Sequence, residues 1–449
     1  MLGRGACSTT PRRAQRTARR PSPFDRATRF KDPPRRVLSR IPDRNIWRVY
    51  GAIFLLSLGY GIVLSILAVF LDGRGLGKTQ IGSLAAWFAL GIVCFSIPVG
   101  LLIRRFSART VLIASLAGYA VSITIFPFLP GYPAMVADRF LDGACSVGVW
   151  VSCETILLSR ARRHDKAFVT SLYAVSMALG YVVGPFVSKL LVAYGPMRWA
   201  FVAAGSVAAT AGLLSAFGLD PDLAPDHGEQ GVPAREAGAL VSPASAPAAS
   251  SFTVFSRIKT SCFATFAYGY FQASVVPFLP LYLIAHKGIT TAQTILIPVY
   301  FGVGMLGFSV VAGRLGDRYG HLLLMRGLAM IGTLMILGFV FLDRYPAMCA
   351  AVLVAGASLA SISPVSLALQ GVVTPHQDLS RSNAIYNVFY AGGMLLGPLV
   401  SGWIFETRGG VPMLYHLVAM WTVFIVFSVL FAGDDPASQR RRAAAHLAP

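Results

Sequence analysis

The chain has little charge and few acidic residues. Of its 449 residues 13% are charged, and 19 Asp and Glu stand against 39 Lys and Arg, while 55% are hydrophobic. This composition is too apolar for a soluble domain and predicts an integral membrane protein. The formal net charge of +20 would suggest a nucleic acid partner in a soluble protein. Here it gathers in the amino-terminal tail and short loops, as membrane topology explains, so we expect no nucleic acid partner.

Motifs of metal, nucleotide and enzyme sites are also missing. The six cysteines and seven histidines are scattered, without a C-x-x-C pair or the spacing of metal ligands. The stretch Gly75-Leu-Gly77-Lys78-Thr79 ends like a nucleotide-binding loop but lacks its first glycine at the required spacing. The chain contains neither H-E-x-x-H nor a nucleophile elbow. We therefore expect no metal, no cofactor and no enzyme activity.

Long apolar runs are abundant, and each is long enough to cross the hydrocarbon core of a bilayer as a helix. The sequence predicts an all-α membrane protein with twelve spans, near residues 49–70, 80–101, 110–129, 134–158, 168–192, 199–218, 260–284, 293–313, 325–342, 347–370, 383–405 and 411–432.

The spans form two groups of six, in residues 46–218 and 257–432. Residues 219–256 turn polar and rich in Ala, Pro and Ser, which predicts a flexible linker between the groups. Residues 1–45 are basic and proline-containing, which predicts a disordered cytoplasmic segment. An organellar transit peptide or translation from an upstream start codon are alternatives for this segment. Residues 433–449 form the expected cytoplasmic tail.

Basic residues predict the orientation of the spans. With the amino terminus inside, the inner loops and carboxyl tail carry seventeen Lys and Arg, whereas the outer loops carry six. Positively charged loops stay on the cytoplasmic side, so both termini are predicted to be cytoplasmic, in the inner or plasma membrane.

The two groups are related by one constant shift along the chain. This shift places Gly100 on Gly313, Gly143 on Gly356, Tyr173 on Tyr386, and Gly184-Pro185 on Gly397-Pro398. Four widely spaced matches predict two homologous halves with pseudo-symmetry. We expect Gly100 and Gly313 to lie where helices pack closely.

The turn from Gly313 to Gly320, with Asp317 and Arg318 inside it, has the pattern G-x-x-x-D-R-x-G. It resembles the signature between the second and third helices of each half in the major facilitator superfamily. The resemblance covers residues 46–432 and implies two parallel six-helix bundles that move a small molecule across a lipid bilayer by alternating access.

The first-half copy of this turn departs from the signature. It retains Gly100 and Arg105, but Arg104 replaces the Asp, and Ser107 replaces the second Gly. The resemblance implies that the acidic residue closes the cytoplasmic side by contacting the opposite half. For Asp317 we expect a basic helix start as the partner, comprising Arg162, Arg163 and Lys166. The inner gate should therefore be asymmetric.

The fourth span carries most of the charge within the predicted membrane region. At 100° per residue a polar stripe runs along it, with Arg139, Asp142, Gly143, Ser146, Trp150, Cys153 and Glu154. We expect the stripe to face a central cavity, because charges at that depth need water or a partner.

Arg139-Phe-Leu-Asp142-Gly143 resembles the superfamily motif R-x-x-Q-G, which implies proton coupling through Arg139. Asp142 and Glu154 are candidate proton carriers. The alternatives are a structural ion pair of Arg139 with Asp138 or Asp142 near the outer surface, and a position at the inner interface for Glu154.

The fifth span contains Gly180, Gly184 and Pro185 in a pattern that resembles the motif G-x-x-x-G-P-x-x-G-G of antiporter members. Ser188 and Lys189 replace its last two glycines. The eleventh span repeats the pattern with Gly393, Gly397 and Pro398, so helix packing in both halves is an alternative to a mark of antiport.

Scattered polar and aromatic side chains could form the wall of a substrate cavity for an amphipathic or mixed ligand; they are Tyr60, Trp150, Tyr268, Gln272, Asn383, Tyr386, Asn387 and Tyr390. The function expected from these features is proton-coupled efflux of a small molecule by a protein that works as a monomer. Proton-coupled uptake, or a sensor or scaffold that does not transport, are the alternatives.

Overall fold

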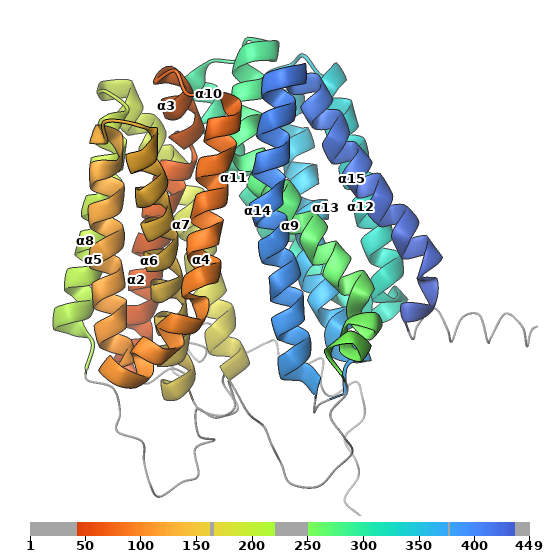
Figure 1. The fold of residues 1–449 in the computed structure, drawn as a ribbon, viewed down its shortest axis with the longest axis horizontal. Coiled ribbons are helices and arrows are strands. Elements are labelled where there is room, and N and C mark those ends of the chain that lie inside the picture. The colour runs from red at the N-terminus through yellow and green to blue at the C-terminus, as the bar shows by residue number, and fades with distance from the viewer. Residues whose placement is uncertain (1–42, 162–165, 221–249, 376–377, 436–449) are drawn as a thin grey trace, which may run out of the picture. The chain divides into compact units, whose positions relative to one another are not determined.

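A computed structural model describes residues 43–161, 166–220, 250–375 and 378–435, and all of these are arranged as helices and short connections (Figure 1). Twelve helices of the described part are long and apolar enough to cross a membrane. Six of them precede residue 221 and six follow residue 249, as the sequence predicted.

The first bundle is built from α2 (Arg44–Leu64), α3 (Leu67–Gly73), α4 (Lys78–Phe106), α5 (Ala108–Ile125), η2 (Phe126–Phe128), α6 (Tyr132–Arg160), α7 (Lys166–Tyr194) and α8 (Arg198–Gly218). The second is built from α9 (Ser251–Lys287), α10 (Thr291–Thr294), α11 (Ile297–Tyr319), α12 (His321–Phe341), α13 (Tyr345–Val373), α14 (Leu379–Arg408), α15 (Gly410–Leu430) and η4 (Ala432–Asp434). We call the end where α2 begins and α15 ends the base, and the opposite end the top.

Some predicted boundaries were wrong. The helix expected at 260–284 begins at Ser251, so residues 251–256 belong to the second bundle and not to the linker. The Ser250 hydroxyl accepts a hydrogen bond from the amide of Thr253 at 3.2 Å and caps the helix start. Val254 and Ile258 then pack into the second bundle, so burial extends the helix beyond the hydrophobic run. The runs at 49–70 and 293–313 are each divided, into α2 and α3 and into α10 and α11.

The two halves repeat the same close helix contacts. A methyl group added at Gly91 would collide with the carbonyl oxygen of Phe140, and one added at Gly143 with that of Phe88, so α4 and α6 touch backbone to backbone. The shift that relates the two halves places the equivalent glycine contacts in the second bundle. Gly304 lies against the carbonyl of Leu353 and Gly356 against that of Phe301, which joins α11 to α13. The repeat found in the sequence is therefore also a repeat of packing.

These contacts predict which glycines tolerate a side chain. We expect Gly91→Ala and Gly304→Ala each to destabilise the solubilised protein by about 1–3 kcal/mol, because the added methyl group forces the helices apart. Gly100→Ala and Gly313→Ala are the matched controls, since nothing lies within 4 Å of a Cβ at either position. Thermal unfolding in detergent measures the difference. Equal midpoints in all four variants would contradict the packing assigned to α4, α6, α11 and α13.

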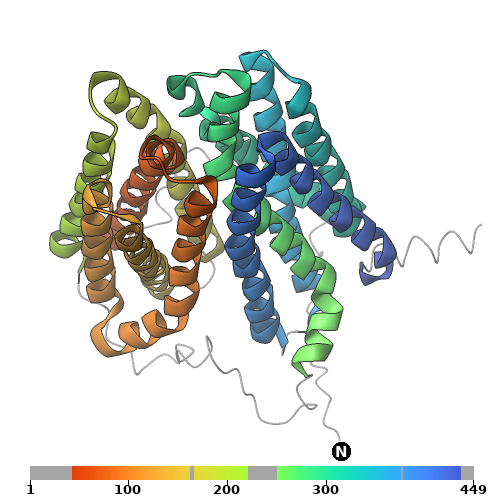
Figure 2. The same ribbon diagram turned by 45° about the horizontal axis from the view of Figure 1, so that its top comes forward.

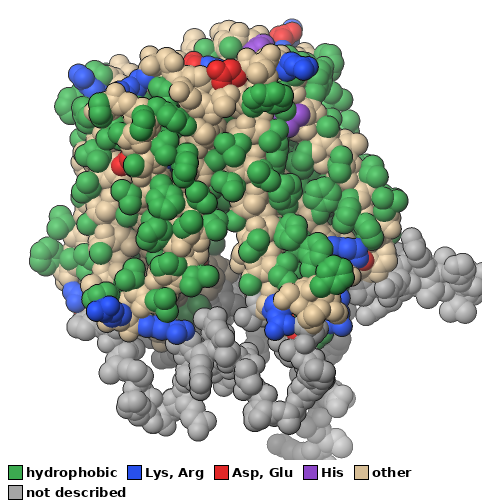
Figure 3. All heavy atoms as spheres, viewed as in Figure 1, with side chains coloured by type: hydrophobic (Ala, Val, Ile, Leu, Met, Phe, Trp, Pro, Cys, Tyr) green, Lys and Arg blue, Asp and Glu red, His purple; other side chains and the backbone are tan. Residues whose placement is uncertain are grey.

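The open space at Gly100 and Gly313 contradicts our prediction that both lie at close helix contacts. Both glycines are on the base half of their helices, where the two bundles diverge in Figure 1. Figure 3 shows the molecule hollowed between the bundles at the base. Among the described residues, nothing lies within 4 Å of a Cβ at either glycine, whereas neighbouring Val99 of α4 packs against Val111 and Val147 of its own bundle.

At the top the bundles meet through α4 and α14, which lie side by side in Figure 2. A Cβ at Gly82 would collide with the carbonyl oxygen of Pro398, and one at Gly402 would lie 2.6 Å from that of Lys78. Farther down, α7 and α11 approach at Val182 and Gly302. The protein is therefore closed at the top and open at the base.

A band of hydrophobic side chains covers the middle of the face seen in Figure 3, and Lys and Arg lie at the base and along the top edge. Large apolar side chains of the membrane-crossing helices are exposed, among them Ile97, Val121, Leu213 and Leu334. Such a surface is stable in lipid and not in water, so the band is the membrane-embedded part.

Candidate functional site

An ion pair is buried inside the first bundle. Arg139 and Asp142, one turn apart on α6, form it, and Asp142 has no exposed surface. The Arg139 guanidinium also lies over the ring of Phe88 on α4, 4.5 Å from its centroid. Neighbouring Asp138 is 6% exposed, and its Oδ2 has no hydrogen-bond partner among the described residues. Three ionisable groups thus share one turn in the interior of the bundle.

Ser146 connects this ion pair to α2. Its hydroxyl lies 2.6 Å from the Asp142 carbonyl oxygen and 3.3 Å from Oδ1 of the same residue. The Tyr60 hydroxyl of α2 donates a hydrogen bond to Ser146. The hydrogen-bonded chain therefore runs from Tyr60 through Ser146 to the Asp142 backbone carbonyl and carboxylate.

Aromatic rings surround Tyr60. Trp150 stacks on it with 6.1 Å between ring centroids, and Tyr119, Tyr181 and Phe88 lie at 5.0, 6.0 and 6.4 Å. The rings come from α4, α5, α6 and α7, so all the helices around the ion pair contribute to this aromatic cluster. It offers flat apolar surface beside a polar chain.

The polar stripe does not line a cavity along its whole length, contrary to our expectation. Asp142, Ser146 and Cys153 have no exposed surface, and Gly143 packs on α4. Trp150 is half-buried and Glu154 is exposed. The reason is that α2, α4 and α5 all pack against α6. Residues within a sector about 60° wide on one helix can contact several different neighbouring helices. The helical period alone does not reveal which of these residues a neighbour covers.

The second bundle has its own polar and aromatic group. Tyr268 and Tyr390 stack with 6.3 Å between centroids, and the Tyr390 hydroxyl donates to Gln272 at 3.1 Å. Tyr386 and Ser366 share a hydrogen bond of 2.8 Å. Tyr268 and Tyr386 are buried, whereas Gln272 and Tyr390 are half-buried. Residues Asn383 and Asn387 of α14 are exposed, and the Gln370 amide donates to Asn383 at 2.6 Å.

The glycine motifs of α7 and α14 pack within their own bundles. Gly180 and Gly184 lie against α2, at Phe54 and Gly61, while Gly393 and Gly397 lie against α9, at Phe266 and Tyr270. Pro185 and Pro398 are inside their helices. The same kind of contact in both halves agrees with a packing role for the motif.

The charged turns at the base also repeat. Ser107 and Gly320, which occupy the same position in the repeat, both have φ of 94°, and Ser107 is the one non-glycine residue of the described part with positive φ. Glycine adopts this conformation without the strain that a Cβ causes. Asp317 is exposed, and His321 approaches its carboxylate at 3.4 Å. Its expected partners cannot be compared, because Arg162 and Arg163 and the side chain of Lys166 lie outside the described residues.

At each turn an arginine lies over the aromatic ring of the residue that follows it in the sequence. The guanidinium of Arg105 lies 5.2 Å from the ring of Phe106, and that of Arg318 lies 5.3 Å from the ring of Tyr319. Both arginines are exposed at the base.

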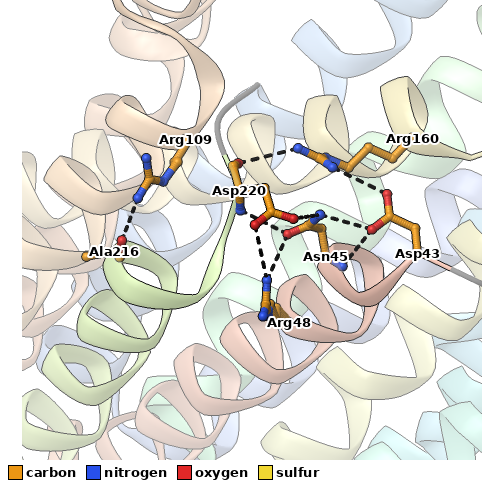
Figure 4. Close-up of polar contacts among 7 residues, drawn as sticks. All are labelled: Asp43, Asn45, Arg48, Arg109, Arg160, Ala216 and Asp220. Carbon is orange, nitrogen blue, oxygen red and sulfur yellow. Dashed lines mark hydrogen bonds and ion pairs between the residues drawn. The ribbon is translucent and has the colours of Figure 1, made fainter. Parts of the chain in front are cut away.

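A polar cluster ties the helix ends of the first bundle together at the base (Figure 4). The Asn45 amide donates to Asp220 at 2.8 Å and to Asp43 at 3.0 Å, and Arg160 reaches Asp43 at 3.4 Å. The hydrogen bond from Asn45, followed by the nearby Arg48, lowers the pKa of Asp220 below its usual value. Nearby, Arg109 donates to the carbonyl of Ala216 at 2.5 Å. These contacts thus link the start of α2 to the ends of α6 and α8.

Sequence reasoning missed Phe88, Tyr119 and Tyr181 of the aromatic cluster. Aromatic residues are common in membrane helices, so their spacing carried no signal. Only the packing of α4, α5 and α7 around Tyr60 identifies them. It also missed Glu406, whose contact with α4 joins residues 327 positions apart.

Comparison with known proteins identifies the family. The Major Facilitator Superfamily profile matches residues 49–260 and 261–448. Relatives include the "Uncharacterized MFS-type transporter YcaD" of Salmonella enteritidis, 22% identical over 88% of this chain and 97% of its own length. The same-named protein of Salmonella arizonae is 23% identical over 86% and 95%.

Solved structures share the fold. The nucleoside transporter NupG superposes with a TM-score of 0.69 at 14% identity, over 87% of this chain and 98% of that one. A bacterial homologue of the human lysosomal transporter Spinster, inward-facing and unoccupied, gives 0.66 at 12% identity, over 88% and 96%. With the two repeated bundles and twelve membrane helices, these matches show that the chain belongs to the Major Facilitator Superfamily and is a secondary transporter that works by alternating access.

Proposed function

We propose that this transporter exports a small molecule from the cytoplasm in exchange for protons, as a monomer in the inner or plasma membrane. The observation that carries the proposal is the buried Arg139–Asp142 pair, connected through Ser146 to Tyr60. A buried charge is costly, so an ionisable pair at this depth needs a compensating role. Proton binding at Asp142 would free Arg139 and alter the hydrogen bonds that reach Tyr60.

The aromatic residues support a ligand of mixed character. Tyr60, Trp150 and Tyr181 in the first bundle, with Tyr268 and Tyr390 in the second, supply flat surfaces and hydroxyl groups. Gln272, Asn383 and Asn387 add hydrogen-bonding groups. These side chains suit a molecule with an apolar ring and polar substituents. The name of the structural relative NupG puts nucleosides among the compounds to test.

The base faces the cytoplasm in this proposal, and both termini lie there. The excess of Lys and Arg in the base loops supports this orientation. The conformation closed at the top is then the inward-open state.

Proton-coupled uptake is the second candidate. The motif of α7 ends in Ser188 and Lys189 where the antiporter pattern has glycines. Ser188 is fully buried, and its hydroxyl has no partner among the described residues. Both copies of the motif also pack in the same way, which weakens it as a mark of antiport.

Proteoliposomes with a pH-sensitive dye inside distinguish these functions. A panel of nucleosides and amphipathic aromatic amines is loaded, and counterflow identifies a transported compound. For an antiporter we expect protons to move opposite to the compound, so that an outward gradient of the compound acidifies the vesicle interior. Protons that move out with the compound indicate symport. Net flux of a compound that counterflow has identified, with no change of pH, would refute proton coupling. The absence of counterflow across the panel at normal folding would favour the sensor or scaffold.

A further inference from the structure

One contact at the top joins the two bundles through a carboxylate. Glu406 lies in the last turn of α14, and its Oε2 accepts a hydrogen bond of 2.7 Å from the backbone amide of Thr79. Thr79 is the second residue of α4. We call this contact the top latch. It links the second bundle to the first at the end where the protein is closed.

The start of a helix favours such a contact. The first amides of α4 have no partners within the helix, and the helix dipole is positive there. A carboxylate that accepts from one of them makes a charge-assisted hydrogen bond. Lys78, which pairs with Asp72, lies 6.0 Å from the ring of Phe405, the residue before Glu406, and adds positive charge nearby.

Small residues bring the carboxylate to the helix start. A side chain at Gly77 would collide with the carboxylate of Glu406, and one at Gly402 would lie 2.6 Å from the carbonyl oxygen of Lys78. One turn below, Gly82 lies under the carbonyl of Pro398. The latch is therefore at the end of a continuous close contact between α4 and α14, which must separate when the top opens.

The top latch has no equivalent between the symmetry-related helix ends, those of α7 and α10. The shift that places Gly100 on Gly313 relates Glu406 to Ala193 and Thr79 to Ala292. Ala193 has no side-chain acceptor, so the second pair of helix ends cannot form this bond. The charge-assisted contact is present on one side of the top only.

We propose that Glu406 is a gating residue that stabilises the top-closed conformation by capping α4, and that its release is part of opening toward the top. The proposal uses only alternating access, which the family shares. It does not depend on proton coupling or on the direction of transport, so it stands or fails separately from them.

A cysteine at Ala86 reports on opening of the top. Ala86 is 4% exposed and lies on the face of α4 that carries Thr79 and Gly82, two turns below the latch. A membrane-impermeant maleimide is applied to the protein in lipid nanodiscs, where both ends meet the reagent. We expect Glu406→Ala to raise the labelling rate about fivefold, the factor that about 1 kcal/mol of lost capping produces.

Thr79→Pro tests the donor separately. It removes the amide that donates to Glu406, in the first turn of α4, where the backbone amides have no partner within the helix. We expect the same rise in labelling, and no further rise when it is combined with Glu406→Ala. Arg408→Gln, an exposed change in the same turn of α14, is the matched control and should label like the parent. Elution as a single species and the thermal midpoint check the fold.

The proposal is overturned if Glu406→Ala labels at the parental rate while it remains folded. It is also overturned if the effects of Glu406→Ala and Thr79→Pro on the labelling rate multiply in the double variant. A rise in Arg408→Gln as large as that in Glu406→Ala would overturn it too, since general surface charge would then be the cause.

Discussion

Asp142→Asn is expected to lower proton-driven transport at least tenfold while it changes ligand binding less than threefold. The change leaves the shape of α6 and removes the group that titrates beside Arg139. Coupling requires a group that gains and loses a proton, whereas a neutral ligand that contacts Tyr60 or Trp150 does not. Flux driven by a pH gradient is compared with equilibrium binding in the same preparation.

Loss of one charge also leaves the other unpaired, so stability must be measured beside flux. Breaking a buried ion pair costs about 3–5 kcal/mol, whereas replacing both partners can be nearly neutral. The double variant Arg139→Gln with Asp142→Asn should therefore recover the thermal midpoint but not the coupled flux. Arg139→Ala alone should reduce both.

Glu154→Gln is the matched control, since it removes a carboxylate from the same helix three turns nearer the base, where the side chain is exposed. We expect a smaller effect on coupled flux. If Asp142→Asn keeps full coupled flux and Glu154→Gln loses it, Glu154 is the proton carrier. If neither variant changes coupled flux at normal expression, the Arg139–Asp142 pair is structural.

Asp317→Asn is expected to shift the conformational equilibrium about tenfold toward the base-open state. In this conformation its side chain is exposed and approached by His321 at 3.4 Å. The carboxylate is thus available for the opposite bundle when the base closes. A closing contact contributes about 1–3 kcal/mol, so its loss should leave the present state unchanged and destabilise the closed base.

A cysteine at Asn387, exposed in the base-open structure, measures this shift by its labelling rate. Asp317→Asn should raise that rate, and Arg104→Asp should lower it, because the new carboxylate would be attracted to the positive start of α14. Glu406→Ala favours opening at the other end, so combined with Asp317→Asn it should return labelling toward the parental value. Unchanged labelling and transport in Asp317→Asn would make the turn a connector and not a gate.

The repeated turn shows which structural features a local sequence pattern predicts and which it does not. The match of Gly100 with Gly313 predicted two equivalent turns, and Ser107 and Gly320 do share one backbone conformation. The same match predicted close packing at both glycines, which is absent here. Backbone conformation at a turn depends on neighbouring residues, whereas packing depends on whether the opposite bundle is near.

The sequence by itself determined the number of spans and the two halves, and it offered the Arg139–Asp142 pair as one of two possible ion pairs. Each follows from short-range properties: the length of an apolar run, a repeat along the chain, and an i, i+3 spacing on one helix. Tertiary structure alone decided the Tyr60–Ser146 bond, the rings around Tyr60 and the contact of Glu406 with Thr79. These contacts join residues far apart in the chain, and their formation depends on how helices pack. It also decided which end is open, because the open and closed arrangements keep the same helices and differ in the few contacts between the bundles.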